Sequence, residues 1–211
     1  MHFNDRYDAA LKLIPLLEKY KNDRGVVLAV PRGGVALGYY IARHYNFPLE
    51  LILTKKIGHP VNSEFAIGAV GLEGEVINPG SEVSESYIAK EIQRIRESLK
   101  ERQKQFMGNR KPVDLRGKTI IIVDDGIATG NTIIASIKMM RNKEPKKIVV
   151  AVPVAPPDTA RKIKALADDF ICLHTPVEFF GVGQFYEDFS EVTDEEVIQY
   201  LKEANGYHQA A

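Results

Sequence analysis

Short, largely apolar runs alternate with amphipathic stretches along most of this chain. The apolar runs cover residues 26–30, 49–53, 119–123, 148–154 and 169–173. Such runs are typical of parallel strands that are covered on both faces. Between them, apolar residues recur at helical spacing, for example in residues 10–17, after a capping Asn4 or Asp5. Strands that alternate with helices predict an α/β fold with a doubly wound, mostly parallel sheet.

The segment between residues 54 and 84 has a less regular pattern. Residues 67–72 and 75–77 predict the two strands of a hairpin that turns at Glu73-Gly74. Residues 55–64 contain a glycine, a proline and no clear period, and we interpret them as a mobile loop.

The rest of the chain completes one predicted domain that spans residues 1–211. Ser84 begins a long amphipathic helix that runs to about Phe106. After residue 176 an aromatic-rich tail precedes a short predicted helix from about Asp194 to Ala204. No repeat and no linker divides the sequence, although residues 176–204 are a candidate for a small subdomain.

Composition narrows the classes of protein that fit this pattern. Lys plus Arg and Asp plus Glu both number 28, so the formal net charge is zero and we expect neither a nucleic-acid partner nor a membrane surface. The first 20 residues hold three acidic residues and no long apolar run, which is unlike a signal peptide or a membrane span. Cys172 is the only cysteine, so an internal disulfide is impossible. We therefore expect a cytoplasmic protein.

The segment from Ile120 to Thr132 carries the clearest chemistry in the sequence. An apolar strand delivers Asp124 and Asp125 to the edge of the sheet, and a turn then presents residues 129–132 at a helix N-terminus. Unpaired backbone N–H groups and the helix dipole at such a terminus favour a phosphate group, and Gly130 allows a close approach. The carboxylates would repel a phosphate unless a ribose diol or Mg²⁺ lies between them. A solvated strand-end turn is the plainer alternative for an Asp-Gly pair.

The segment resembles the 5-phosphoribosyl-1-pyrophosphate (PRPP) motif of the type I phosphoribosyltransferase family, in which two acids precede a Thr-Gly-x-Thr loop. The resemblance implies a type I phosphoribosyltransferase core with a small hood that the chain termini build. It also implies PRPP binding by Asp124, Asp125, Ala128, Thr129, Gly130, Asn131 and Thr132. Mg²⁺ is the implied cofactor, with Asp124 and Asp125 as indirect metal-binding residues.

Two further segments extend the resemblance. Pro31-Arg32-Gly33-Gly34 is similar to the family's pyrophosphate-binding loop, in which the bond before the basic residue is often cis. Lys55-Lys56-Ile57-Gly58-His59 lies where the family has its flexible catalytic loop. The resemblance therefore implies pyrophosphate binding by Arg32, Gly33 and Gly34, and catalytic roles for Arg32, Lys56 and His59. Taken alone, Arg32-Gly33-Gly34 also suits a plain turn, and paired lysines in loops are usually solvated.

The acceptor is not identified by these motifs. Where the 6-oxopurine enzymes of the family usually carry an acid before the Thr-Gly pair, this chain has Ala128, which cannot exchange a proton. Hypoxanthine and guanine are therefore disfavoured, whereas orotate, uracil, adenine or an unusual acceptor stay open. Residues 65–69 and 183–189 are similar to a subgroup of predicted phosphoribosyltransferases without a defined acceptor. Phe179, Phe180 and Tyr186 either build a hood over the acceptor or pack a small subdomain.

Two functions follow from these hypotheses. The first is an Mg²⁺-dependent phosphoribosyltransferase that displaces pyrophosphate from PRPP with a nitrogenous base or a related small-molecule acceptor. The alternative is a regulator on the same fold that senses PRPP or a nucleotide without turnover. A phosphorelay receiver fits poorly, because receivers carry their acidic pair near the start of the domain. Proteins with this fold often pair, so a homodimer is an expectation as well.

Overall fold

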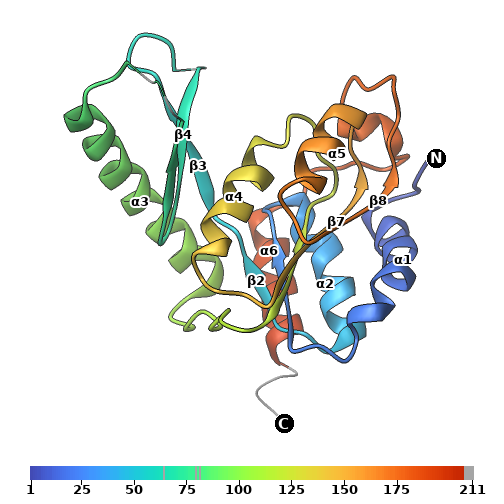
Figure 1. Ribbon diagram of the computed structural model, residues 1–211. Helices are drawn as coiled ribbons and strands as arrows, with labels where there is room; N and C mark the ends of the chain where they lie inside the picture. The colour runs from blue at the N-terminus through green and yellow to red at the C-terminus, as the bar shows by residue number, and fades with distance from the viewer. Residues whose placement is uncertain (64, 79, 81, 207–211) are drawn as a thin grey trace.

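The core of the protein is a five-stranded parallel sheet, seen here in a computed structural model (Figure 1). The structure describes residues 1–63, 65–78, 80 and 82–206, so Glu64 of the predicted loop and the last five residues of the predicted domain lie outside it. The strands are β1 (Gly25–Ala29), β2 (Leu49–Leu51), β6 (Thr119–Val123), β7 (Lys147–Val154) and β8 (Asp169–His174). Their order is β2-β1-β6-β7-β8 and every pairing is parallel, which confirms the predicted fold class.

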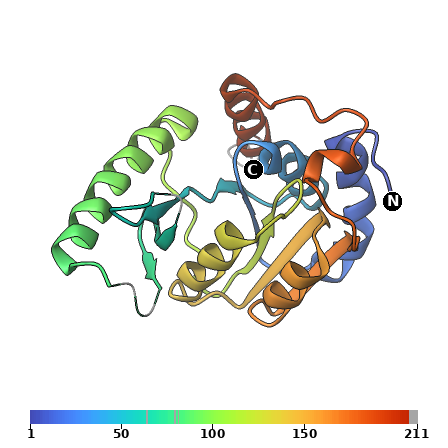
Figure 2. The same ribbon diagram turned by 90° about the horizontal axis from the view of Figure 1, so that it is seen from above.

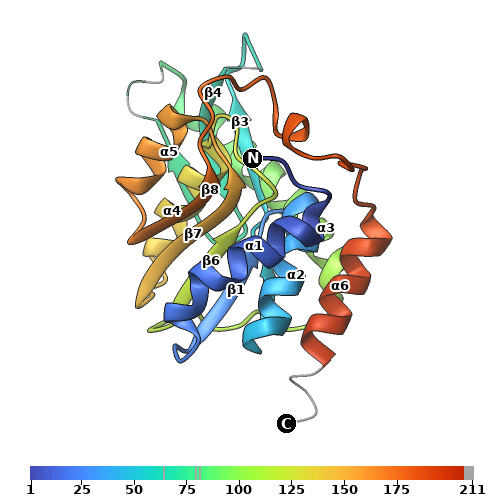
Figure 3. The same cartoon turned by 90° about the vertical axis from the view of Figure 1, so that its right-hand side faces the viewer.

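Two layers of helices cover the sheet, because alternate residues of each strand point to opposite faces. Val27 and Ile121 face the layer of α1 (Arg6–Leu17), α2 (Gly33–Tyr45) and α6 (Asp194–Gly206). Val26 and Ile120 face α4 (Asn131–Arg141) and α5 (Pro157–Lys164). Figure 3 shows the sheet between these two groups. Burial of both faces explains why the strands are apolar throughout rather than alternating with polar residues. Two short 3₁₀ turns, η1 (Glu18–Tyr20) and η2 (Val182–Phe185), complete the helical segments.

A second, antiparallel sheet and one long helix form an arm that extends from the core (Figures 1 and 2). Its strands are β3 (Thr54–Gly58), β4 (Ala66–Gly71) and β5 (Glu75–Ile77), in that order, and its helix is α3 (Glu85–Met107). The predicted hairpin and long helix are confirmed, and the Ser84 hydroxyl accepts the Tyr87 N–H at 3.3 Å as an N-cap. Ile95, Leu99 and Phe106 are the buried residues of the helix.

The loop prediction for residues 55–64 is wrong in its first part, because residues 55–58 belong to β3. Lys55 and Lys56 are exposed while Ile57 is buried, so the strand has no regular alternation that a sequence pattern could reveal. A register irregularity at Ile57 and Gly58 interrupts the pairing with β4 as well. No helix among the residues described is both long and apolar enough to cross a membrane.

The arm is tied to the tail by an ion pair between α3 and α6. Both nitrogens of the Arg102 fork contact Asp194, at 2.6 and 2.7 Å, and the guanidinium lies 4.3 Å from the centre of the Phe106 ring. Asp194 belongs to the first turn of α6, where the helix dipole also favours a carboxylate. Bidentate pairing and ring stacking together fix the end of the arm against the core.

We expect Arg102→Met to loosen this junction without unfolding the sheet. Methionine keeps an apolar stem against Phe106 but removes both hydrogen bonds to Asp194, so a loss of about 1 kcal/mol in the free energy of unfolding is expected. Hydrogen exchange should become faster in the first turn of α6 and the last turns of α3. Arg161→Met removes an exposed i,i+3 pair with Asp158 on α5 and serves as the matched control. Unchanged exchange at α6 in Arg102→Met would contradict the role of the pair.

Candidate functional site

The pairing of β1 with β6 brings two loops together at the carboxyl ends of the strands. Ala29 is in register with Val123, and the Val30 N–H donates to the Val123 carbonyl at 3.0 Å. The loop 31–34 therefore leaves the sheet beside Asp124. A Cβ atom on Gly34 would lie 2.9 Å from the Asp124 Cα, so the two backbones are in direct contact. Ligands of open parallel sheets collect at this edge.

Gly33 places the first loop against the acid pair. A Cβ atom at this position would lie 1.8 Å from Asp125 Oδ2, so no larger residue fits while the carboxylate keeps its place. The bond between Pro31 and Arg32 is cis, as the resemblance implied. The predicted loop and the predicted acid pair thus form one continuous surface.

The loop after the acids turns into α4 at Gly130, whose φ of +76° favours glycine. The Thr159 hydroxyl donates to the Ala128 carbonyl at 2.7 Å and fixes the loop from the α5 side. Among the residues that the structure describes, no backbone N–H from Ala128 to Ile133 donates to another protein group. Ala128, Thr129, Asn131 and Thr132 are exposed, whereas Gly130 and Ile133 are buried. We call residues 128–133 the anion loop.

The acid pair lies between the anion loop and loop 31–34. Asp124 Oδ1 accepts the Asp125 N–H at 2.9 Å. Burial raises the pKa of Asp124 well above its ordinary value, the neighbouring charge of Asp125 raises it further, and Arg6 opposes both. The Tyr186 hydroxyl donates to the Asp125 carbonyl at 2.6 Å and so holds the backbone of the acid pair. The pair is therefore an electrostatically costly arrangement that the fold holds in place.

Arg6 is a site residue that the sequence interpretation missed. Its Nε donates to Asp125 Oδ2 at 2.8 Å, and both side chains are largely buried. Arg6 opens α1, far from Asp125 in sequence, and a lone arginine in the first turn of an amphipathic helix is usually solvated. No local pattern in the sequence identifies this contact.

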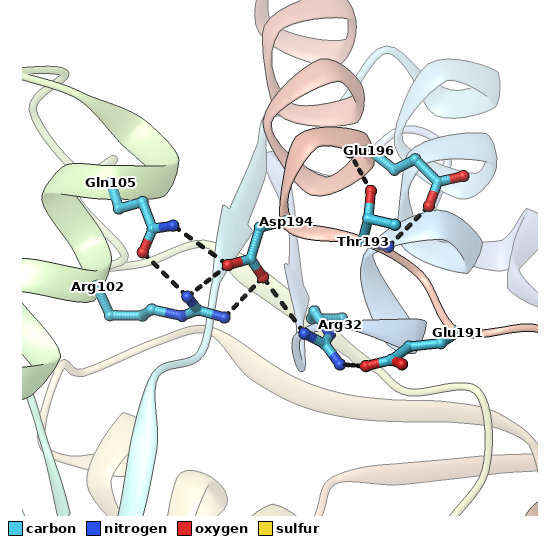
Figure 4. A network of polar contacts seen from close by, with 7 residues as sticks. All are labelled: Arg32, Arg102, Gln105, Glu191, Thr193, Asp194 and Glu196. Atoms are coloured by element: carbon cyan, nitrogen blue, oxygen red, sulfur yellow. Dashed lines mark hydrogen bonds and ion pairs between the residues drawn. The ribbon is translucent and has the colours of Figure 1, made fainter.

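Arg32 contacts two acidic side chains, Glu191 and Asp194 (Figure 4). Its guanidinium forms an ion pair with Glu191 and lies 3.5 Å from Asp194 Oδ1. Asp194 is shared with Arg102 of the arm, so the tail joins the predicted pyrophosphate loop to α3. Glu191 is 74% exposed and Arg32 is 36% exposed, which makes their contact one that water can compete for.

The tail closes over the site through aromatic and aliphatic contacts. Phe179 packs beside Phe185 with ring centres 5.6 Å apart, whereas Phe180 is 92% exposed. Tyr186 is buried, so its ring supports the acid pair and is not open to stack on a ligand. Val182 covers the turn after the acids, where a Cβ on Gly126 would lie 2.4 Å from the valine Cγ1. The predicted hood range 176–204 comprises this covering tail and most of α6, which packs on α2 and α3.

The predicted catalytic residues Lys56 and His59 belong to the arm, whereas the acid pair follows a strand of the core sheet. Lys55 and Lys56 are exposed on β3, and His59 follows at the tip of the arm. His59 Nδ1 accepts the Val61 N–H at 3.2 Å, and its ring lies 6.1 Å from that of Phe65. Arg32, in contrast, adjoins the acid pair through Gly33 and Gly34.

A cavity of about 310 Å³ lies at the other end of β6 and α4. Leu115 before β6 and Met140 near the end of α4 line it, together with Glu50 of β2. Arg110 Nη2 lies 2.8 Å from Glu50 Oε1, so the buried carboxylate has a charge partner. No residue of the anion loop or of loop 31–34 lines this cavity, and it is separate from the site described above.

Comparison with known proteins identifies the family of this chain. The family described as "Phosphoribosyl transferase domain" matches residues 8–188, and the chain belongs to this family. Two curated relatives from Mycobacterium tuberculosis, strains CDC 1551 and H37Rv, are provisionally named phosphoribosyl transferases. Each is 35% identical over 208 residues, which cover 96% of this chain and 47% of the relative. The chain thus spans about half the length of these relatives.

A solved structure is similar over almost the whole chain. The crystal structure of TT1426 from Thermus thermophilus is 37% identical and superposes with a TM-score of 0.87. The match covers 96% of this chain and 99% of that one. The two proteins therefore share one architecture over nearly their full length.

Asp124→Asn is expected to raise the melting temperature of the unliganded protein, and to raise it more at about pH 8 than at about pH 4. The folded-state pKa of Asp124 is raised, so the unfolded chain releases this proton at a lower pH than the folded chain does. The wild type therefore loses stability as the pH rises between the two pKa values, and the amide, which does not titrate, avoids that loss.

Thermal unfolding at both pH values measures the difference between the two chains. Asp158→Asn, at a carboxylate that is 80% exposed, is the matched control and should change little at either pH. At about pH 8, Asp124→Asn could instead melt at or below the melting temperature of the wild type. That result would refute the electrostatic cost that we assign to the acid pair.

Proposed function

We propose that this protein transfers a 5-phosphoribosyl group from PRPP to a nitrogenous acceptor. The observation that carries the proposal is the anion loop, in which consecutive backbone N–H groups at the start of α4 have no partner among the described residues. Such a row of donors, with the helix dipole behind it, suits the 5-phosphate of a ribose ester. Asp124 and Asp125, directly before the loop, suit the ribose hydroxyl groups.

The leaving group would lie over loop 31–34, which adjoins the acid pair. Arg32 offers the positive charge there, and Gly33 and Gly34 let the loop lie directly against the acid pair. In the proposed reaction an acceptor nitrogen bonds to ribose C1 as the bond from C1 to the pyrophosphate oxygen breaks. The pyrophosphate leaves with the bonding electrons, and the proton of the acceptor nitrogen passes to water or to the departing pyrophosphate. The protein contributes mainly position and charge.

Mg²⁺ is part of the proposal through the substrate rather than through a protein cage. Among the described residues, no group of three or more His, Cys, Asp or Glu side chains could hold a metal ion. Mg²⁺ commonly keeps several waters while it binds substrate phosphates, and Asp124 and Asp125 would contact it indirectly. Bound in this way, the ion would neutralise charge on the diphosphate.

The acceptor is expected to differ from hypoxanthine and guanine. Ala128 is exposed at the position that faces the acceptor in the family, and its side chain cannot exchange a proton. Its carbonyl is engaged by the Thr159 hydroxyl, which holds the loop in one orientation. Lys56 and His59 on the arm are the proposed groups that would close over the leaving pyrophosphate.

PRPP with Mg²⁺ should raise the melting temperature of the wild type, and Asp125→Asn should lose most of this shift. The reason is that an amide replaces a carboxylate oxygen that would accept a ribose hydroxyl, at a cost of about tenfold or more in affinity. Asp114→Asn, at an exposed acid before β6, is the matched control and should keep the full shift. A wild type that is not stabilised by PRPP contradicts the proposal.

Pyrophosphate release in the presence of PRPP and a panel of bases separates an enzyme from a sensor. Release that depends on one acceptor supports transfer, whereas stabilisation by PRPP without release for any base supports the regulatory alternative. Arg32 already contacts Glu191 and Asp194, and these contacts would have to be replaced before it bound pyrophosphate. The regulatory alternative is therefore tested as well.

Glu191→Gln is expected to strengthen the binding of inorganic pyrophosphate by up to about fivefold. In the wild type a phosphate oxygen must replace the Glu191 carboxylate at Arg32, and the amide competes less strongly for the guanidinium. Isothermal titration calorimetry measures the difference. Glu195→Gln removes the same charge from the first turn of α6 and controls for net charge, because the described residues show no ion pair between Glu195 and Arg32. Equal affinity for pyrophosphate in both variants would show that Glu191 does not compete.

A further inference from the structure

The guanidinium of Arg6 is held by three contacts of different kinds. Its side chain is 12% exposed. Nε donates to Asp125 Oδ2 at 2.8 Å, Nη1 donates to the Ser190 carbonyl at 2.8 Å, and the group lies 4.2 Å from the centre of the Phe189 ring. Three different contacts thus fix one guanidinium, which is unlike a solvated surface arginine.

Pairing between the two ends of the chain delivers Arg6 to this place. The Phe3 N–H donates to the Phe185 carbonyl at 2.8 Å, and the Glu187 N–H donates back to the Phe3 carbonyl at 2.9 Å. The Asp188 N–H then donates to the Asn4 carbonyl at 2.8 Å. Because α1 begins directly afterwards, its first residue points into the acid pair with little freedom left.

Arg6 lies at the junction of the two parts of the proposed substrate site. A Cβ atom on Gly33 would be 1.8 Å from Asp125 Oδ2 and 3.1 Å from Arg6 Nε, so loop 31–34, the acid and the arginine meet at one point. Contacts to Asp125 and Ser190 occupy Nε and Nη1. Within the described part of the chain, Nη2 of Arg6 has no recorded hydrogen-bond acceptor.

A cation in a fixed position would stabilise the negative charges of the acid pair and of a bound diphosphate. A diphosphate over loop 31–34 would lie beside two carboxylates, and like charges at such short range repel strongly. Arg6 neutralises Asp125 through Nε and has further N–H donors for a second anion, because a guanidinium has five N–H donors in a fixed plane. Arg32, the cation of loop 31–34 itself, contacts Glu191 and Asp194.

Resting on the proposed function, we propose that Arg6 is a further binding residue of this site, where Nε holds Asp125 and Nη2 donates to an oxygen of a diphosphate. The ligand class is a sugar diphosphate ester or free pyrophosphate. The arginine thus acts on both halves of the ligand: it orients the carboxylate that takes the ribose and it binds the group that leaves. Arg6 lies outside the motif segments 31–34 and 120–132.

Calorimetric titration of the full chain with three ligands tests the assignment. The ligands are inorganic pyrophosphate, PRPP and ribose 5-phosphate, each with Mg²⁺. Arg6→Gln is expected to weaken the binding of pyrophosphate and PRPP by about tenfold or more, which corresponds to about 1.4 kcal/mol. Ribose 5-phosphate lacks the diphosphate, so its affinity should fall by a clearly smaller factor. Arg6→Lys keeps the charge without the planar fork and should lie between the wild type and Arg6→Gln.

Arg116→Gln is the matched control, because it removes one exposed arginine at the opposite end of β6. Its affinities should equal those of the wild type. Thermal unfolding without ligand shows whether Arg6→Gln is folded at the temperature of the titration. If Arg6→Gln is unfolded, Arg6→Lys decides the question. An Arg6→Lys variant that binds pyrophosphate as tightly as the wild type would show that the planar guanidinium is not needed.

Each outcome distinguishes the inference from the function on which it rests. A wild type that binds none of the three ligands contradicts both. A wild type that binds them, with an Arg6→Gln that binds pyrophosphate equally well, contradicts only the role of Arg6. An equal loss for pyrophosphate, PRPP and ribose 5-phosphate would limit Arg6 to holding Asp125 and would overturn the diphosphate contact.

Discussion

The parallel pairing of β1 with β6 is the constraint on which the rest of the site depends. Because Ala29 and Val123 are in register, both strands end at the same level and their loops leave the sheet side by side. Glycine at positions 33 and 34 then lets the first loop approach the acid pair to contact distance. A shift of register by one residue would turn the strand side chains to the other face and separate the two loops.

The chain ends add a second constraint, because they close the site from above. Phe3 and Asn4 pair with residues 185–188 through their backbones, and the tail then continues past Arg32 to α6. Backbone pairing of this kind depends little on side-chain identity, which explains how distant segments can be placed without a recognisable motif. The tail thereby connects the sheet edge, the first helix and the arm into one unit.

Sequence patterns predicted the core because burial on both faces leaves a clear apolar signal. The strand at 119–123, the helix from Asn131 and the cis bond at Pro31-Arg32 all follow from local residues or from the resemblance. The strand β3 was missed because its lysines are exposed and its pattern is irregular. Arg6 was missed for a different reason, since its partner is far away in sequence and only the tertiary fold brings them together.

The contact between Gly126 and Val182 has a consequence for relatives of this chain. The valine fills the space in which a side chain at position 126 would have to lie, so the sizes of the two residues are coupled across the domain. Homologous chains with alanine at the first position should carry a smaller residue at the second. Covariation of this pair would then mark the relatives whose tail follows the same path over the acid pair.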